Sequence, residues 1–320
     1  MKVNALSNIN FNINFKSNNH KLPQLKQDEF VRTTQAKSID NSPEAFEHWA
    51  KETDFISRID EITENPGNII GSGFEGTTYT IPDCEEWVIK EYKRSTFTNF
   101  STPSPKIIKI KDVTPDLNIG QFVALVRIPY GQNTTRNTYV LKKQTGKSYG
   151  VSYQDKDFVT TSTKSAHISS LKKLSEFPQT SFDKLIDDID YITNQGYKFD
   201  CDNPYNYLLD SKNMSINFVD VADKLEENKT QFGEVLFALL DANYAKTFES
   251  SDLVSDDEKQ QAYAYSKEIC SKFLKAMVRK NHKFTASPYF DKVYNSKAFD
   301  GALGVKSADE KIDLMYKLGL

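Results

Sequence analysis

The sequence lacks several features that would assign it at once to a class. No stretch approaches the ~18 consecutive apolar residues that a membrane-spanning helix needs. Cysteine is scarce, and the three that occur, Cys84, Cys201 and Cys270, are far apart and odd in number, which excludes a disulfide framework. The four histidines show no metal-ligand spacing. Neither sign of charge dominates, because 41 basic against 44 acidic residues give −3, and this argues against nucleic acid as the main ligand.

The chain has 320 residues, enough for one large domain or a two-lobed domain with an extension, and its 38% hydrophobic residues suit a packed core. Residues 1–40 are rich in Asn and Ser and lack the apolar core of a secretory signal peptide, so we predict a disordered leader there. Residues 41–65 are predicted to form a helix, with Ser42 as its cap and Pro43 at its first position. This helix is expected to pack on the lobe that follows. Its apolar stripe is Phe46, Trp49, Phe55, Ile56, Ile59 and Ile62.

A glycine-rich stretch at 69–90 reads IIGSGFEGTTYTIPDCEEWVIK. Gly71, Gly73 and Gly76 stand at the spacing G-x-G-x-x-G, and an apolar strand then ends on Lys90. Glycines let backbone N–H groups approach phosphate oxygens, and a lysine adds a point charge for the same phosphates. Taken alone, the pattern favours a plain glycine-rich hairpin. A second strand follows the glycines where a dinucleotide-binding site would have a helix, which argues against that class.

The remaining patterns predict a small β-rich lobe followed by a helical lobe. Strands are expected at 77–81, 87–90, 106–111, 122–128 and 138–141, with a turn at 129–136, so that residues 66–145 form the first lobe. Helices are expected at 181–196, 232–244, 256–280 and 308–318, so that residues 146–320 form the second. The two lobes are expected to meet near residues 142–150.

A second informative stretch lies at 199–223, FDCDNPYNYLLDSKNMSINFVDVAD. Asn206 is followed by a predicted strand, a turn and another strand that ends on Asp220. Because the two residues lie at the ends of one hairpin, their side chains can converge on a cation. Mg²⁺ prefers hard oxygen ligands and takes one or two from protein, which an Asn and an Asp supply.

In this order and spacing, the two stretches resemble the nucleotide-binding lobe and catalytic loop of protein kinases. The resemblance implies an α+β, two-lobed kinase-like fold that uses ATP and Mg²⁺. It implies that Lys90 holds the α- and β-phosphates and that Asn206 and Asp220 bind Mg²⁺. It also implies that the phosphates are covered by the glycine loop, which comprises Gly71, Ser72, Gly73, Phe74 and Gly76.

The sequence departs from the kinase pattern at three points. H-R-D is absent and Cys201 occupies the position of the catalytic aspartate, so the base is expected to be Asp202 or, failing it, Asp200. No glutamate lies between residues 92 and 121 to pair with Lys90. The chain has no A-P-E after Asp220 and enters the next apolar helix directly, which resembles the minimal kinases that bacterial pathogens inject through type III secretion.

The predicted function is therefore ATP-dependent phosphate transfer to a Ser, Thr or Tyr hydroxyl. We expect an effector secreted into the host cell cytoplasm, or otherwise a protein of the bacterial cytoplasm. Its expected partner is a host protein, either substrate or activator, with no nucleic acid and no membrane span. Two alternatives remain. One is a pseudokinase that acts as a binding module, and the other is a kinase-fold enzyme that transfers another group, such as AMP, or acts on a small molecule.

Overall fold

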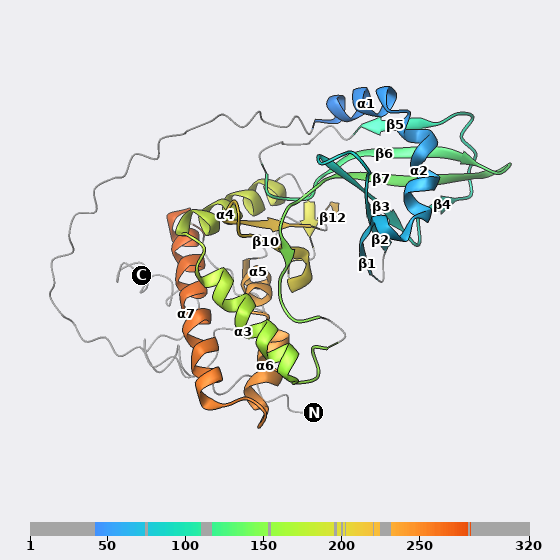
Figure 1. Ribbon diagram of the computed structural model, residues 1–320. Helices are drawn as coiled ribbons and strands as arrows, with labels where there is room; N and C mark the ends of the chain where they lie inside the picture. The colour runs from blue at the N-terminus through green and yellow to red at the C-terminus, as the bar shows by residue number, and fades with distance from the viewer. Residues whose placement is uncertain are drawn as a thin grey trace. The chain divides into compact units, whose positions relative to one another are not determined.

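The computed structural model describes residues 42–282 apart from 74–75, 110–116, 153–154, 195–196, 200, 202, 220, 225–231 and 281. Within these residues the chain divides into two units (Figure 1). A strand-rich unit comprises 42–109 and 122–143, and a helical unit comprises 117–121 and 144–282. The chain is thus mixed α and β, with a β-rich sheet in one unit and most of the helices in the other. The predicted leader and the helix at 308–318 lie outside the described residues.

The strand-rich unit is built on an antiparallel sheet in the order β1-β2-β3-β7-β6-β5, with β4 also paired to β7. Its strands are β1 (Ile69–Ser72), β2 (Gly76–Thr80), β3 (Trp87–Tyr92), β4 (Phe97–Thr98), β5 (Lys106–Lys109), β6 (Phe122–Tyr130) and β7 (Thr134–Lys142). The predicted strands are confirmed where the structure describes them. The predicted turn at 129–136 is too long, because β6 and β7 pair as far as Tyr130 and Thr134 and leave only 131–133 between them.

Two helices precede the sheet where the sequence predicted one. α1 (Pro43–Glu52) begins as expected, since the Ser42 side chain accepts a hydrogen bond from the Ala45 amide. It ends at Thr53, and Asp54 then adopts a left-handed conformation with φ 48° before α2 (Phe55–Glu64) begins. That single residue redirects the chain, so the prediction of a continuous helix was wrong. A short 3-10 turn, η1 (Pro66–Asn68), leads into β1.

α1 and α2 pack on one face of this sheet (Figure 1). Phe46, Phe55, Ile59 and Ile62 of the predicted stripe are buried together with Trp87, Val126 and Val140 of the strands. The Trp49 and Trp87 ring centroids lie 5.5 Å apart, and these are the two tryptophans of the chain. Because successive strand residues point to opposite faces, Ile89 faces the helices and its neighbour Lys90 faces away from them.

The helical unit contains α3 (Thr161–Ser175), α4 (Gln179–Asn194), α5 (Phe232–Leu239), α6 (Ala242–Ser250) and α7 (Asp256–Arg279). The predictions at 181–196 and 256–280 are confirmed within the described residues. The helix predicted at 232–244 is two helices, because Asp241 has a left-handed φ of 47°. α3 was not predicted. None of the helices that the structure describes is both long and apolar enough to cross a bilayer.

Short strands complete the helical unit. β8 (Lys147–Ser148), β10 (Tyr207–Asp210) and β11 (Ser215–Phe218) form one small sheet in the order β11-β10-β8. β9 (Tyr197–Phe199) pairs with β12 (Val221–Lys224) in another. The predicted hairpin after Asn206 is confirmed as β10–β11, which pairs in register from Tyr207 with Phe218 to Asp210 with Ser215.

Candidate functional site

The predicted site residues fall in both units, and each unit is described separately. The glycine loop and Lys90 belong to the strand-rich unit, and Asn206 belongs to the helical unit. Phe74, Asp200, Asp202 and Asp220 lie outside the described residues, so their roles stay predictions.

The glycine loop joins β1 and β2, the outermost pair of strands on one side of the sheet. The Gly73 amide donates to the Gly76 carbonyl at 2.9 Å and closes the hairpin. The Lys93 ammonium donates to the Gly73 carbonyl at 2.8 Å, and the Ser72 and Thr77 hydroxyls lie 3.2 Å apart. All four residues of β1 are exposed. The loop is therefore anchored on one side and open to solvent along β1.

The three glycines differ in whether packing within the described chain explains them. A Cβ on Gly76 would overlap the backbone carbonyl oxygen of Glu91, so packing alone explains that glycine. A Cβ on Gly71 or Gly73 would meet no atom of the described residues within 4 Å. Contacts within the described chain therefore do not explain these two glycines. Their bare backbone is instead suited to the close approach of an external group such as phosphate.

The register of the sheet places a glycine and the lysine in one row. Gly71 is paired with Thr78, Thr78 with Lys90, and Lys90 with Tyr139. Neighbouring strands lie about 4.8 Å apart, so Gly71 and Lys90 are separated by about 10 Å across the sheet. Directly paired residues point to the same face of a sheet. The row therefore belongs to the face to which Lys90 points, which α1 and α2 do not cover. The sequence predicted both residues but not this row.

Lys90 sits beside an aromatic cluster. Its Nζ lies 4.5 Å from the centroid of the Tyr92 ring, a distance at which a cation is attracted by the ring face. Tyr92 contacts Tyr139 edge-on at 5.1 Å, and Tyr139 contacts Phe122 at 5.7 Å. The cluster brings together residues of β3, β6 and β7. It limits where the Lys90 ammonium can lie and presents π faces next to it.

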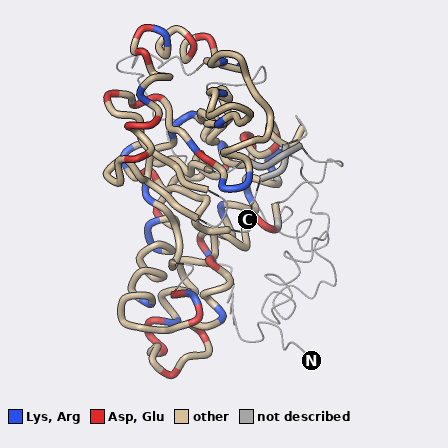
Figure 2. The backbone as a smooth tube through the Cα atoms, turned by 90° about the vertical axis from the view of Figure 1, so that its right-hand side faces the viewer, with Lys and Arg blue, Asp and Glu red and all other residues tan. Residues whose placement is uncertain are grey.

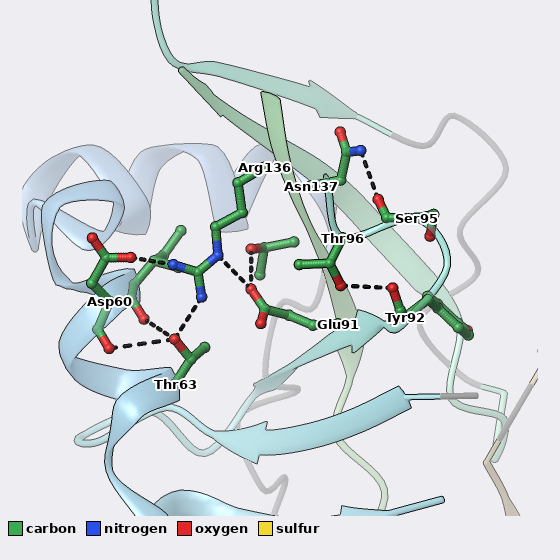
Figure 3. Close-up of polar contacts among 10 residues, drawn as sticks. Asp60, Thr63, Glu91, Tyr92, Ser95, Thr96, Arg136 and Asn137 are labelled. Carbon is green, nitrogen blue, oxygen red and sulfur yellow. Dashed lines mark hydrogen bonds and ion pairs between the residues drawn. The ribbon is translucent and has the colours of Figure 1, made fainter. Parts of the chain in front are cut away.

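A glutamate does stand next to Lys90 in the sequence, but its side chain points to the other face of the sheet. Glu91 accepts a hydrogen bond from Arg136 Nε at 2.8 Å (Figure 3) and another from the Thr138 hydroxyl at 3.1 Å. Arg136 also donates to the Thr63 hydroxyl at 2.6 Å and forms an ion pair with Asp60 of α2. Burial lowers the pKa of Arg136, but the Glu91 and Asp60 carboxylates outweigh it and raise that pKa above its ordinary value.

The sequence analysis did not predict this ion-pair network of Asp60, Glu91 and Arg136. The kinase pattern places a helix glutamate within 92–121, whereas the described part of that segment contains strands and loops only. Glu91 and Arg136 each have an exposed side-chain fraction of only 11%. The available signal was an arginine within a strand, Arg136 in TTRNTYVLK, which needs a buried acidic partner. The network fastens α2 to β3 and β7.

Asn206 ends the 3-10 turn η2 (Pro204–Asn206), which Asn203 caps by accepting from the Tyr205 amide at 3.1 Å. Asn206 is buried, and its carbonyl accepts a hydrogen bond from the Val219 amide at 2.8 Å. Val219 directly precedes Asp220 in the sequence. The backbone therefore joins the two ends of the β10–β11 hairpin, and the metal pair of Asn206 and Asp220 stays a prediction. Side-chain oxygens of Asn and Asp are the donor types that fit Mg²⁺.

The far end of the same hairpin is fixed by a buried carboxylate. Asp210 accepts from the Thr145 hydroxyl at 2.5 Å, from the Asn213 side chain at 2.8 Å and from the Lys212 amide at 2.9 Å. Burial raises the pKa of Asp210, but these hydrogen bonds outweigh it and hold the pKa below its ordinary value. The Asn217 side chain donates to the Thr145 carbonyl at 2.7 Å. The hairpin that carries Asn206 is thus held rigidly at both ends.

A buried histidine and carboxylate tie α3 to the start of α6. His167 Nδ1 lies 3.4 Å from Asp241 Oδ2, and the same oxygen accepts from the Val151 amide at 3.0 Å. Nearby, the Tyr149 hydroxyl donates to the Leu239 carbonyl at 2.6 Å, and burial, with a contribution from Asp241, raises the pKa of Tyr149 well above its ordinary value. Every polar group named here has a partner, so we assign this cluster a structural role.

Within the described residues, no three His, Cys, Asp or Glu side chains lie close enough together to hold a metal ion. Among proteins compared with this chain, no protein-family model and no curated sequence matches it. A search of solved structures finds the pseudokinase domain of BIR2, an immune regulator of the RLK/Pelle family, at 11% identity and a TM-score of 0.29. That match covers 78% of this chain and 86% of the other. The assignment of individual residues rests on the sequence pattern and on the geometry within each unit.

Proposed function

We propose that the chain is an ATP-dependent phosphotransferase of the protein-kinase type. The observation that carries the proposal is the cross-strand row of Gly71, Thr78 and Lys90. Gly71 lacks a side chain although no described neighbour would clash with one, so its backbone is open to an external group. Lys90 lies on the same face of the sheet, about 10 Å away. A backbone open to phosphate and a fixed ammonium are the two elements that bind a nucleoside triphosphate in such enzymes.

In this proposal each residue has a defined role. The Gly71 and Gly73 backbone covers the phosphates, and Lys90 neutralises the α- and β-phosphate charge. Asn206 and Asp220 would hold Mg²⁺, which would neutralise phosphate charge there. Asp202, or failing it Asp200, accepts the proton of a Ser, Thr or Tyr hydroxyl. As that oxygen bonds to the γ-phosphorus, the bond to the β-phosphate oxygen breaks and ADP leaves.

A second candidate is a nucleotide-binding module without transfer activity. It is favoured by Glu91, which pairs with Arg136 on the face opposite Lys90. In an active kinase a helix glutamate would hold the lysine, but the described part of 92–121 contains no helix. The Tyr92 ring, 4.5 Å from the Lys90 ammonium, is one contact that positions it. Both candidates need nucleotide binding, and they differ only in transfer.

The biological setting is a separate part of the proposal. The Asn- and Ser-rich leader at 1–40 supports export from a bacterium into a host cell, where a host protein would be substrate or activator. Fusing residues 1–40 to a reporter tests it. Translocation of the reporter into cultured host cells, lost in a strain without the secretion system, is the expected result. A reporter that stays in the bacterium would overturn the export proposal and leave the nucleotide site untouched.

Titration of the full chain with ATP, in the presence and absence of Mg²⁺, tests the nucleotide site. We expect saturable binding that Lys90→Ala weakens at least about tenfold, because a charge-assisted contact to phosphate is lost. Lys106→Ala, an exposed lysine on β5 of the same sheet, is the matched control and should bind as the parent does. Binding without transfer would favour the binding module. Equal affinity of the parent and Lys90→Ala would remove the proposed site.

A further inference from the structure

The outermost strand of the sheet, β1, presents an open edge. Among the described residues it pairs with β2 on one side and with no strand on the other (Figure 1). All four of its residues are exposed, and two of them are large and apolar, Ile69 at 44% and Ile70 at 56%. An edge strand displays backbone N–H and C=O groups that pair readily with another extended segment. β1 is therefore a candidate site for strand addition.

The opposite edge of the sheet is protected by charge, whereas the edge at β1 is not. β5 begins with Lys106 and ends with Lys109, and lysine is a common protection of an exposed edge. Charged residues are interspersed along much of the described chain (Figure 2), but 65–73, which include β1, contain none. β1 thus lacks the feature that would keep another strand away from it.

One face of β1 continues a buried apolar row. Ile69 is paired with Tyr79, Tyr79 with Ile89, and Ile89 with Val140. The last three are at most 9% exposed and belong to the core that the sheet forms with α1 and α2. Ile69 shares their face, because directly paired residues do, yet it is exposed at the end of the row. A further strand with apolar residues on this face would cover Ile69 and extend the row.

The leader contains a segment with the pattern that such a strand requires. Residues 8–16 read NINFNINFK, in which Ile9, Phe11, Ile13 and Phe15 alternate with asparagines. Strict alternation over this length is typical of a strand with one apolar and one polar face. Asparagine is depleted in strands, so we expect this segment to need an existing edge with which to pair. Residues 9–15 carry no charge, so pairing them with β1 would bury none.

The leader is long enough to reach β1. It enters the described structure just before α1, and Glu44 of α1 lies 3.1 Å from Lys109 of β5, at the far edge of the sheet. From β1 to β5 the sheet is about 25 Å wide, because its strands lie about 4.8 Å apart. The 26 residues from Lys16 to Asn41 span up to about 85 Å when extended. The connection therefore permits pairing within one chain.

We propose that residues 9–15 pair with β1 of the same chain as an added edge strand, with their Ile and Phe side chains on the face of Ile69. A second copy is the weaker candidate. Pairing of β1 with β1 would join only four residues on each side, which falls short of the ~1,200 Å² that a stable interface buries. A tethered segment needs less contact, because the connection keeps its effective concentration high. The pairing is independent of nucleotide binding.

Hydrogen exchange of the full chain, followed by mass spectrometry, tests the pairing. We expect amides in 9–15 to exchange at least about tenfold more slowly than in a free peptide of the same sequence, because strand pairing protects them. Ile69→Ser combined with Ile70→Ser should remove this protection. Tyr130→Ser, which replaces an apolar residue of the same unit with a similar exposure of 54%, is the matched control and should retain it. Tryptophan fluorescence verifies that each variant is folded.

The leader is tested in the same assay with two sets of serine substitutions. Replacing its four apolar residues should speed exchange across 69–72, whereas replacing the asparagines should not. The apolar set is Ile9, Phe11, Ile13 and Phe15, and the control set is Asn8, Asn10, Asn12 and Asn14.

Three outcomes would overturn the proposal. The first is exchange of 9–15 at the rate of the free peptide, and the second is protection that survives both the β1 variant and the apolar leader variant. The third is protection that rises with protein concentration, which would assign the β1 edge to a second copy.

Discussion

Replacing Arg136 by Gln should be among the most damaging single changes to the strand-rich unit. Arg136 and Glu91 each have an exposed fraction of 11%, so the substitution leaves the Glu91 carboxylate buried without its cation. Removal of one partner from a buried pair costs about 3–5 kcal/mol. Asp60 also pairs with Arg136, but its exposed fraction is 73%, and exposed pairs contribute about 0–1 kcal/mol. Asp60→Asn is therefore a matched control on the same guanidinium.

The two tryptophans make the measurement specific to this unit. Trp49 and Trp87 pack together between α1 and the sheet, so tryptophan fluorescence during denaturant unfolding reports on the strand-rich unit. We expect Arg136→Gln to lower the free energy of unfolding by several kcal/mol and Asp60→Asn by about 1 kcal/mol at most. Combining Glu91→Gln with Arg136→Gln should cost less than the sum of the single changes, because no charge stays buried alone. Equal, small losses for Arg136→Gln and Asp60→Asn would refute this account of the network.

Two further predictions separate structural from functional residues. Gly76→Ala should lower unfolding stability by about 1–3 kcal/mol, because its Cβ overlaps the Glu91 carbonyl, whereas Gly71→Ala should unfold like the parent yet bind ATP more weakly. Denaturant unfolding and ATP titration of both variants check this, and unchanged affinity in Gly71→Ala would contradict it. Asp210→Asn should cost about 2 kcal/mol at pH 7. Because the folded pKa of Asp210 is depressed, that difference should shrink as pH falls below about 4, and a constant difference would show that the carboxylate charge is not responsible.

Local patterns predicted the secondary structure well where one face of an element is buried. The apolar run that ends on Lys90 indicated β3. The stripe of Phe182, Leu185, Ile186 and Ile189 indicated α4, because burial of one helix face selects a period of 3.6 residues. The Ser42 cap of α1 was predictable for a different reason: its hydrogen bond joins residues only three apart in the sequence.

Predictions failed where one residue redirects the backbone or where tertiary contacts override polarity. Asp54 and Asp241 each take a left-handed conformation in the middle of an apolar helical pattern, and nothing in the surrounding periodicity indicates the break. α3 is rich in Ser, Thr and Lys. Its buried face is only His167, Leu171 and Leu174 with small polar residues, too sparse for a periodicity argument.

The sequence nominates residues for the candidate site but does not indicate their geometry. Spacing identified Gly71 and Lys90, but only the strand register shows that they share one row with Thr78. Glu91 was overlooked because its partner, Arg136, lies 45 residues away in the sequence. A pairing across the sheet leaves no local signal, whereas the β10–β11 hairpin after Asn206 does, because its strands are joined by a short turn.

The central claim, phosphate transfer that depends on Lys90, is tested most directly by the intact mass of the chain after incubation with ATP and Mg²⁺. The account predicts that the parent chain gains the mass of one or more phosphates. Lys90→Ala and Asp220→Asn should gain none while remaining folded by tryptophan fluorescence. A parent chain that binds ATP and Mg²⁺ with no mass gain would contradict transfer. A gain that persists in Lys90→Ala would contradict the assignment of the site.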